Sequence, residues 1–300
     1  MLTLRRAAVL ALLCSLTALF SCDRDQREAG EDSEEPIRLT FAFQPQENPK
    51  GLQLDTQRFV DFITRETGYE AEVFLPTSYA VVVEALRYGN ADIAYFSGLP
   101  YLMAHEASGA QILVVEERDG NPFYYSQWYV AADSDYESLA DLRSKNVAFT
   151  SPTSTSGFLF PMAKVIEEGL VEAQGQPGSF FGEVLFAGGY EQALIALASG
   201  QVEAAAASDY ALQQYLSDEA RENIRVLTRQ GPVPTHGLAS RGDLPEEVRQ
   251  KVLEALLKLN EPENNELLRS VYGAQRLVPR DHKDHVEALT NARTLVLGDQ

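Results

Sequence analysis

The sequence predicts an α/β protein made of two similar lobes. Two observations lead to this expectation. Residues 37–230 alternate strand-like and helix-like segments, the pattern of α/β units with mainly parallel sheets. Within that alternation, the chain matches itself at an offset of 111 residues. We therefore expect each lobe to contain a mainly parallel sheet flanked by helices.

The first set of predicted elements lies between residues 37 and 116. Apolar runs of strand length predict the strands, and apolar residues at helical spacing predict the helices. Gly68 ends the first helix, since glycine readily takes the left-handed conformation that follows a helix. In chain order we expect strand 37–43, helix 52–67, strand 71–75, helix 79–87, strand 91–95, helix 99–108 and strand 111–116.

The second set resumes after Pro122. In chain order we expect strand 127–132, strand 147–150, helix 158–168, strand 184–186, helix 190–198, strand 202–207 and helix 211–216. Two further helix-like segments, 244–259 and 266–273, follow. The chain beyond residue 36 is about 265 residues long, which is enough for two modest α/β lobes.

The internal match covers a helix, a glycine and a short strand in each copy. The paired positions are Tyr79 and Tyr190, Gly89 and Gly200, Asp92 and Glu203, and Ser97 and Ser208. Any helix–glycine–strand unit shares some of these features, but this many matches without a gap favour a duplication. Because ligands of open α/β sheets bind at the carboxyl ends of strands, loops from both lobes would line a cleft between them.

A loop rich in hydroxyl groups is a candidate ligand site. Residues 151–157 read Ser-Pro-Thr-Ser-Thr-Ser-Gly, between a predicted strand and a predicted helix. Their hydroxyls, the backbone N–H groups and the positive end of a helix dipole suit a tetrahedral oxyanion. The alternative is that Ser154 or Ser156 simply caps the helix, although a cap accounts for one hydroxyl. The residues alone leave both interpretations open.

Residues 1–21 have the features of an export signal. Arg5 and Arg6 precede an apolar run, 7–20, that is too short to span a bilayer. Leu19-Phe20-Ser21-Cys22 resembles a bacterial lipobox, in which the cysteine is lipidated; an ordinary secretory signal is the alternative. Lipidation would also explain why the exported chain keeps Cys22 as its one cysteine. We expect the acidic segment 22–36 to be a disordered tether.

Charge and motif content argue against several classes of function. The formal net charge of −19 disfavours nucleic-acid binding, which needs a basic surface. The four histidines have no metal-ligand spacing with cysteines or carboxylates, so we expect no metal. The sequence contains no Gly-x-Ser-x-Gly elbow and no glycine-rich phosphate loop with a lysine. We therefore expect neither an enzyme nor a cofactor.

Six motifs occur in a characteristic order. They are Thr77-Ser78-Tyr79, the run 89–94 (Gly-Asn-Ala-Asp-Ile-Ala), Tyr124-Tyr125-Ser126, the run 152–161 that begins Pro-Thr-Ser-Thr-Ser-Gly, Gly188-Gly189-Tyr190 and Pro232-Val233-Pro234. In these motifs, which cover nearly all of residues 37–280, the chain resembles the phosphonate/phosphite/phosphate-type substrate-binding proteins of bacterial ATP-binding-cassette (ABC) importers. The resemblance implies a type II periplasmic-binding-protein fold. Its lobes would be 37–126 with 236–295, and 127–235, joined by crossovers at 127–132 and 235–240.

The resemblance also implies the ligand-binding residues. In the family, the hydroxyls and amides matching Ser154, Thr155 and Ser156 hold the oxyanion, and tyrosines matching Tyr79 and Tyr124 approach from the cleft walls. The segment 45–51 would face the same cleft, although its polar residues also suit a simple turn.

Two departures from the family bear on the ligand. Relatives commonly have histidine where this chain has Tyr190. Relatives that take aminoalkyl phosphonates place acidic groups near Tyr210 and His236. Asp209 is an acid that could serve there, whereas His236 has the wrong sign when protonated. We therefore expect phosphite, phosphate or an uncharged alkyl phosphonate rather than an aminoalkyl phosphonate.

The expected function is that of an extracytoplasmic, monomeric substrate-binding component of an ABC importer. It would close around a small oxyanion and deliver it to a membrane permease, with ATP hydrolysis on a separate ATPase subunit, while lipidated Cys22 holds it at the membrane. The alternative is a sensor that presents the same anion to a membrane signalling kinase. Cleft closure around the ligand would serve either role.

Overall fold

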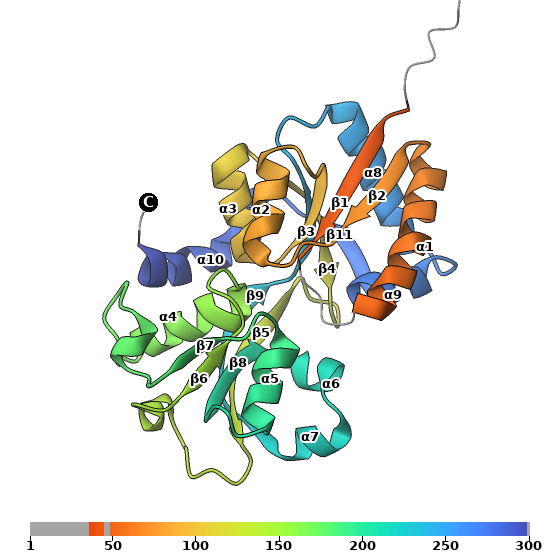
Figure 1. Ribbon diagram of the computed structural model, residues 1–300. Helices are drawn as coiled ribbons and strands as arrows, with labels where there is room; N and C mark the ends of the chain where they lie inside the picture. Colours follow the sequence, from red (N-terminus) through yellow and green to blue (C-terminus); the bar gives the residue numbers. More distant parts are fainter. Residues whose placement is uncertain (1–35, 45–48, 299–300) are drawn as a thin grey trace, which may run out of the picture. The chain divides into compact units, whose positions relative to one another are not determined.

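Two mixed β-sheets, each with helices against its faces, make up the fold (Figure 1). The computed structural model describes residues 36–44 and 49–298. The predicted signal (1–21), Cys22 and the predicted tether up to residue 35 lie outside this range. No helix among the described residues combines the length and the apolar composition needed to cross a bilayer.

The first sheet has the strand order β11-β4-β10-β3-β1-β2. Its strands are β1 (Arg38–Phe43), β2 (Glu70–Phe74), β3 (Ile93–Phe96), β4 (Gln111–Glu117), β10 (Gly237–Ser240) and β11 (Arg276–Pro279). β1 pairs in parallel with β2 and β3, whereas β10 runs antiparallel between β3 and β4. The helices attached to this sheet are α1 (Pro49–Thr67), α2 (Tyr79–Arg87), α3 (Gly98–Ser108), α8 (Glu246–Lys258) and α9 (Asn265–Tyr272).

The second sheet repeats this arrangement without a counterpart of β11, in the order β7-β6-β8-β5-β9. Its strands are β5 (Phe123–Ala131), β6 (Val147–Phe149), β7 (Val184–Phe186), β8 (Ala204–Ser208) and β9 (Ile224–Pro234). β6 is parallel to β7 and β8, and β5 runs antiparallel between β8 and β9. Its α-helices are α4 (Phe160–Glu167), α5 (Tyr190–Ala198), α6 (Ala211–Tyr215) and α7 (Asp218–Glu222). Its other helical turns are the 3-10 turns η1 (Leu139–Leu142) and η3 (Pro177–Ser179) and the π-helical turn η2 (Thr155–Leu159).

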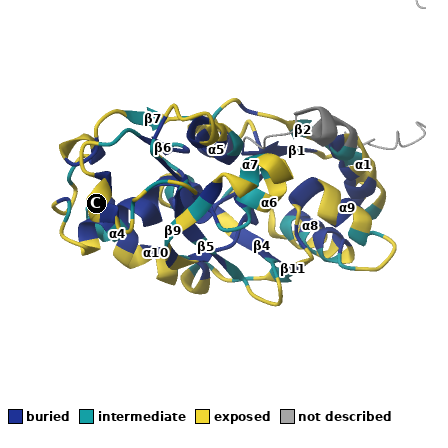
Figure 2. Ribbon diagram, turned by 90° about the horizontal axis from the view of Figure 1, so that it is seen from below, coloured by how far each residue is buried: buried dark blue, intermediate teal, exposed yellow. Residues whose placement is uncertain are grey.

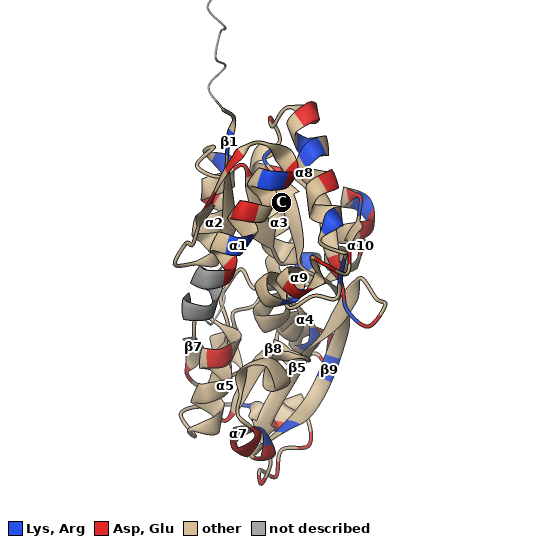
Figure 3. Ribbon diagram, turned by 90° about the vertical axis from the view of Figure 1, so that its right-hand side faces the viewer, with Lys and Arg blue, Asp and Glu red and all other residues tan. Residues whose placement is uncertain are grey.

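Period-two alternation along the strands explains why both faces of each sheet are covered. In β1, Leu39, Phe41 and Phe43 join the core beneath α1 and α8, while Ala42 faces the core beneath α2. Figure 2 shows these strands mostly buried and the outer helix faces exposed. Acidic and basic residues are interspersed on α1 and α8 (Figure 3). An ion pair of 2.8 Å between Glu66 of α1 and Lys258 of α8 joins the two helices.

The predicted duplication is confirmed in detail at the paired acids. Asp92 Oδ2 accepts a hydrogen bond from the Thr40 N–H at 2.8 Å, in β1. Glu203 Oε2 accepts one from the Asn146 N–H, also at 2.8 Å, immediately before β6. Asp92 immediately precedes β3 and Glu203 immediately precedes β8, so each carboxylate bonds to the backbone of the neighbouring parallel strand or of the residue just before it. The helix–glycine–strand units around Gly89 and Gly200 therefore take equivalent places in the two lobes.

The chain enters the second sheet earlier than expected. β5 begins at Phe123, which pairs with Pro234 of β9, and ends at Ala131. The segment 127–132, expected as both a strand and a crossover, is therefore the second half of β5 and the residue after it. Of the other expected crossover, 235–240, the last four residues form β10 in the first sheet. The segments that connect the two sheets are therefore 118–122, between β4 and β5, and 235–236, between β9 and β10. A strand and an extended crossover have the same apolar pattern, which is why the sequence did not distinguish them.

Helix α10 (His282–Leu297) packs on elements of both sheets, although the predicted boundary 236–295 placed it with the first lobe. Leu289, Ala292 and Val296 of α10 share a core cluster with Leu99 and Leu102 of α3 and with residues of α4. Figure 1 shows α10 beside α3 and α4. The helix therefore contributes to the junction of the two lobes.

Candidate functional site

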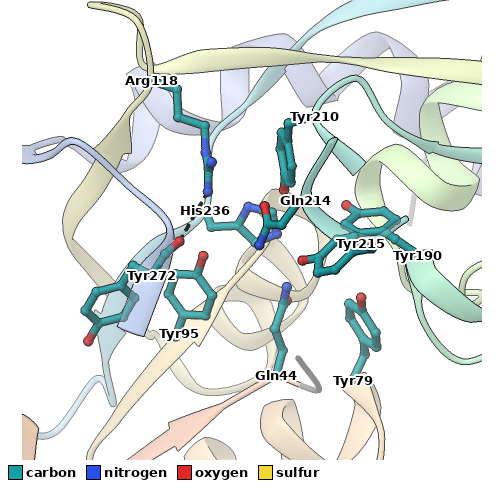
Figure 4. Close-up of a pocket in the computed structure, with 10 residues that line it drawn as sticks. All are labelled: Gln44, Tyr79, Tyr95, Arg118, Tyr190, Tyr210, Gln214, Tyr215, His236 and Tyr272. Atoms are coloured by element: carbon teal, nitrogen blue, oxygen red, sulfur yellow. Dashed lines mark hydrogen bonds between the residues drawn. The ribbon is translucent and has the colours of Figure 1, made fainter. Parts of the chain in front are cut away.

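A polar cavity lies where the loops of the two sheets meet (Figure 4). Most of its walls are tyrosine rings, contributed by both lobes. Its ten described lining residues are Gln44, Tyr79, Tyr95, Arg118, Tyr190, Tyr210, Gln214, Tyr215, His236 and Tyr272. Tyrosine hydroxyls donate hydrogen bonds while the rings exclude water, so these walls suit a small polar ligand.

The two tyrosines related by the internal repeat both line this cavity. Tyr79 is the first residue of α2 and Tyr190 the first residue of α5, and both side chains are buried. Ser78 caps α2 by accepting the Val81 N–H at 3.4 Å. Figure 4 places the two rings on the same side of the cavity. The positive ends of two helix dipoles therefore lie close to the cavity wall.

Ser154 and Thr155 use their hydroxyls within the protein. Ser154 Oγ accepts the Gly157 N–H at 3.1 Å, so Ser154 is the cap of η2, a single π-helical turn that runs into α4. Thr155 Oγ1 accepts the Leu99 N–H at 2.8 Å, at the start of α3. The capping alternative thus holds for Ser154, while Thr155 fastens the second lobe to a helix of the first.

Ser156 belongs to a buried chain of hydroxyls that reaches the cavity. Its Oγ accepts the Tyr124 O–H at 3.0 Å and lies 2.6 Å from the hydroxyl of Tyr190. Burial raises the pKa of Tyr124 well above its usual value, which keeps that hydroxyl protonated as a donor. The Ser126 hydroxyl also holds η2 in place by donating to the Ser156 carbonyl at 2.6 Å. Ser156 therefore connects to the cavity through Tyr190.

Gly157 permits the tight path of this loop. A Cβ at position 157 would lie 2.0 Å from Thr150 Oγ1 and 2.5 Å from Thr150 Cβ, closer than atoms can approach. The Thr150 N–H also donates to the Gly157 carbonyl at 3.1 Å. The glycine of the Ser-Thr-Ser-Gly run is thus required by the close approach of the Thr150 side chain, which follows β6 directly.

A buried ion pair next to the cavity escaped the sequence reasoning. Glu116, at the end of β4, is 0% exposed. Its carboxylate accepts a short hydrogen bond from the Tyr95 hydroxyl and two contacts from Arg118, from Nε at 3.0 Å and Nη2 at 2.9 Å. Burial raises the pKa of Glu116, and Arg118 opposes that rise. The sequence offers no local signal for this burial, because Glu116 and Glu117 both follow the apolar run 112–115.

His236 lies between two aromatic rings. It stacks on Tyr95 with centroids 5.4 Å apart and on Tyr124 with centroids 5.8 Å apart. Its Nδ1 lies 4.0 Å from Glu116 and has no hydrogen-bond partner among the described residues. Burial, helped by the charge of Arg118, lowers the pKa of His236 to about 3. His236 is therefore neutral near physiological pH, and the charge conflict considered for its protonated form does not arise there.

Asp209 lies outside the tyrosine-lined cavity. Its carboxylate pairs with Arg229 at 3.2 Å, and both line a separate hollow beside Asn121 and Gln275. Burial raises the pKa of Asp209. The structure therefore does not bring this acid together with Tyr79 and Tyr190.

Most of the predicted site residues nevertheless gather in one place. Tyr79, Tyr190 and His236 line the cavity, and Tyr124 and Ser156 contact lining residues. The remaining three make the contacts described above. Their roles in ligand binding stay predictions. The described part of the chain contains no group of three His, Cys, Asp or Glu side chains placed to hold a metal ion.

A family model described as "ABC transporter, phosphonate, periplasmic substrate-binding protein" matches residues 41–285. The chain belongs to this family. It is 34% identical over 219 residues to the phosphate-import protein PhnD of Mycolicibacterium smegmatis, covering 71% of this chain and 67% of the relative. It is 25% identical over 270 residues to the phosphonates-binding periplasmic protein of Escherichia coli K12, covering 87% and 78%.

Solved structures of similar proteins share the fold of this phosphonate-type binding protein. A binding component of an ABC phosphonate transporter from Pseudomonas aeruginosa superposes with a TM-score of 0.76 at 21% identity, covering 88% of this chain and 90% of that one. PhnD1 of Prochlorococcus marinus, in complex with methylphosphonate, gives a TM-score of 0.74 at 19% identity, covering 87% and 98%. These matches confirm the two-lobed type II fold.

Family membership confirms the broad part of the expected function. The protein is a periplasmic-type substrate-binding component of an ABC transporter of the phosphonate class. Proteins of this class are extracytoplasmic transport proteins rather than enzymes, which agrees with the expectation at the family level.

Protonation of two buried histidines predicts acid sensitivity. The pKa of His236 and that of His285 in α10 are both lowered to about 3, mainly by burial. Between that value and about 6.5, the unfolded chain binds protons that the native state does not. The free energy of unfolding should therefore fall as pH falls through this window, by up to about 1.4 kcal/mol per pH unit for each histidine.

Chemical denaturation of the wild type, His236→Gln and His285→Gln at pH 7, 5.5 and 4.5 checks this expectation. Each variant should lose stability with falling pH less steeply than the wild type. His285→Gln tests the effect at a position outside the cavity lining, and His236→Gln tests it within the lining. Equal slopes for all three proteins would contradict the account of the buried neutral histidines.

Proposed function

We propose that this protein captures phosphite, phosphate or a small alkyl phosphonate in the tyrosine-lined cavity and delivers it to the permease of an ABC importer. The observation that carries the proposal is the position of Tyr79 and Tyr190. These residues begin α2 and α5, one in each lobe, and Tyr190 is hydrogen-bonded to the Ser156 hydroxyl at 2.6 Å. Donors from both lobes would converge on one tetrahedral anion.

The chemistry of the walls supports an oxyanion held by neutral donors. Hydroxyl groups and helix N-termini hold phosphate-like groups without a full positive charge. The formal net charge of −19 opposes the approach of any anion, so local dipoles must supply the attraction. Methylphosphonate in complex with PhnD1 of Prochlorococcus marinus and the name of the Mycolicibacterium smegmatis import protein are consistent with this ligand class.

We propose that capture proceeds by closure of the lobes. Two described contacts between elements of the two sheets would form on closure and break on opening. They are the bond from the Leu99 N–H to Thr155 Oγ1 at 2.8 Å and the Arg118 guanidinium over the Tyr210 ring at 4.3 Å. A ligand that contacts both lobes stabilises the closed state, which is the form offered to a permease.

The proposal includes attachment to the membrane through lipidated Cys22. Metabolic labelling with palmitate in a bacterial host should label the intact protein and leave a Cys22→Ser variant unlabelled. Equal labelling of the two proteins, or labelling of neither, would reject the anchor without affecting the proposed ligand.

Ser156 offers a direct test of ligand binding. A thermal-shift screen with phosphate, phosphite, methylphosphonate, 2-aminoethylphosphonate, sulfate and taurine identifies the ligand, since a ligand raises stability by mass action. Ser156→Ala should then weaken binding of that ligand by about 1–3 kcal/mol, because a buried anion oxygen or its tyrosine partner loses a hydrogen bond. Isothermal titration calorimetry measures the change.

Ser199→Ala is the matched control for Ser156→Ala. Ser199 Oγ donates to the Ala196 carbonyl at 3.1 Å at the end of α5, away from the cavity lining. Its removal should leave the affinity unchanged. If Ser156→Ala also binds with wild-type affinity, the hydroxyl chain has a structural role only.

A further inference from the structure

The Glu116–Arg118 ion pair lies at the cavity, with one partner in the cavity wall and the other buried behind it. Arg118 lines the cavity, whereas Glu116 is 0% exposed behind Tyr95 and Arg118. Among the described lining residues, Arg118 has the one formally charged side chain, since His236 is neutral near physiological pH. A ligand in the cavity therefore meets a cation before it meets the carboxylate.

Arg118 neutralises the carboxylate of Glu116, and hydrogen bonds within the protein hold its guanidinium in place. Its Nε and Nη2 contact Glu116, Nη2 also donates to the Tyr272 carbonyl at 3.2 Å, and Nη1 donates to the Gly273 carbonyl at 3.1 Å. The guanidinium has five N–H groups in a fixed fork, and each of its three nitrogens donates a hydrogen bond within the protein, while Nη2 also forms the ion pair with Glu116. Two parallel hydrogen bonds from Arg118 to an oxyanion would therefore compete with these contacts.

The carboxylate of Glu116 is occupied in the same way. One oxygen accepts from the Tyr95 hydroxyl, and the other accepts from Arg118. A buried carboxylate with this set of partners is compensated within the protein, and removing the guanidinium would leave it without its counter-charge. The pair therefore presents no free negative charge to the cavity.

We propose that the Glu116–Arg118 pair sets the ligand class of this cavity by excluding oxyanions that carry a cationic substituent. This inference rests on the proposed function. An ammonium group in the cavity would find Glu116 already neutralised and would face the guanidinium of Arg118. Repulsion between like charges is strong in a site that excludes water. Ligands such as methylphosphonate bring no such group, so the pair favours them over 2-aminoethylphosphonate.

The test measures ligand preference by calorimetry in full-length mature protein. Arg118→Met removes the guanidinium, so an ammonium group no longer faces a like charge and can itself become the counter-charge of Glu116. The affinity for 2-aminoethylphosphonate relative to methylphosphonate should therefore rise by about tenfold or more. Propylphosphonate has nearly the shape of 2-aminoethylphosphonate without its charge and should show no such gain. Adding Glu116→Gln to Arg118→Met should abolish the gain, because the amide offers no charge to an ammonium group.

Glu116→Gln alone keeps the inference testable if Arg118→Met does not fold. It leaves the guanidinium without its counter-charge, so the relative affinity for 2-aminoethylphosphonate should fall below that of the wild type. A wild type that prefers 2-aminoethylphosphonate, or variants whose preference matches the wild type, would overturn the inference. Wild-type protein that binds none of these phosphonates, phosphite or phosphate would instead reject the proposed function itself.

Discussion

The buried carboxylate of Glu116 is the constraint on which the arrangement of the cavity depends. A charge removed from water needs partners, and each partner of Glu116 comes from a different part of the chain. Tyr95 comes from β3, and Arg118 from the connection to the second sheet. Arg118 in turn holds carbonyls at the end of α9 and covers the Tyr210 ring of the second lobe. Compensation of the Glu116 charge thus connects the first sheet, the end of α9 and Tyr210 of the second lobe at the cavity.

A second layer of neutral hydroxyls completes the cavity from the opposite lobe. Ser156, Tyr124 and Tyr190 form a buried hydrogen-bonded chain, with Gly157 allowing the loop to pass against Thr150. The duplication provides the counterpart in the first lobe, because Tyr79 begins the helix that corresponds to the one begun by Tyr190. The result is a cavity with many donors and little net charge. In our proposal, hydrogen bonding holds the oxyanion, and the Glu116–Arg118 pair discriminates against a cationic substituent.

Local patterns predicted the fold well and the site only in part. The helices at 79–87 and 190–198 follow from periodicity and from glycine near each end, both of which are local properties. The start of β5 was misplaced because an extended crossover and a strand look alike in sequence. The Ser-Thr-Ser run was recognised as a unit, yet its three hydroxyls have separate partners. The partner of Ser154, Gly157, is local, whereas Leu99 and Tyr190, the partners of Thr155 and Ser156, are distant in sequence and are set by tertiary packing.

The burial of the Glu116–Arg118 pair could not be predicted from the sequence either. Two acids and an arginine at the end of a strand look like a solvated turn, and the fold alone decides that Glu116 faces inward while Glu117 is less buried. His236 likewise changes meaning once its neighbours are known, since two stacked rings and burial make it neutral. Some of the tyrosines and hydroxyl residues of the site could be anticipated from sequence, whereas the buried ion pair and the partners of each group depend on tertiary packing.

The most direct measurement is a crystal structure of the mature protein with methylphosphonate bound. We expect phosphonate oxygens within hydrogen-bonding distance of the hydroxyls of Tyr79, Tyr190 and Ser156, with the Glu116–Arg118 pair still intact. Phosphonate oxygens paired directly with the guanidinium of Arg118 or Arg229, or a ligand bound outside the tyrosine-lined cavity, would contradict it.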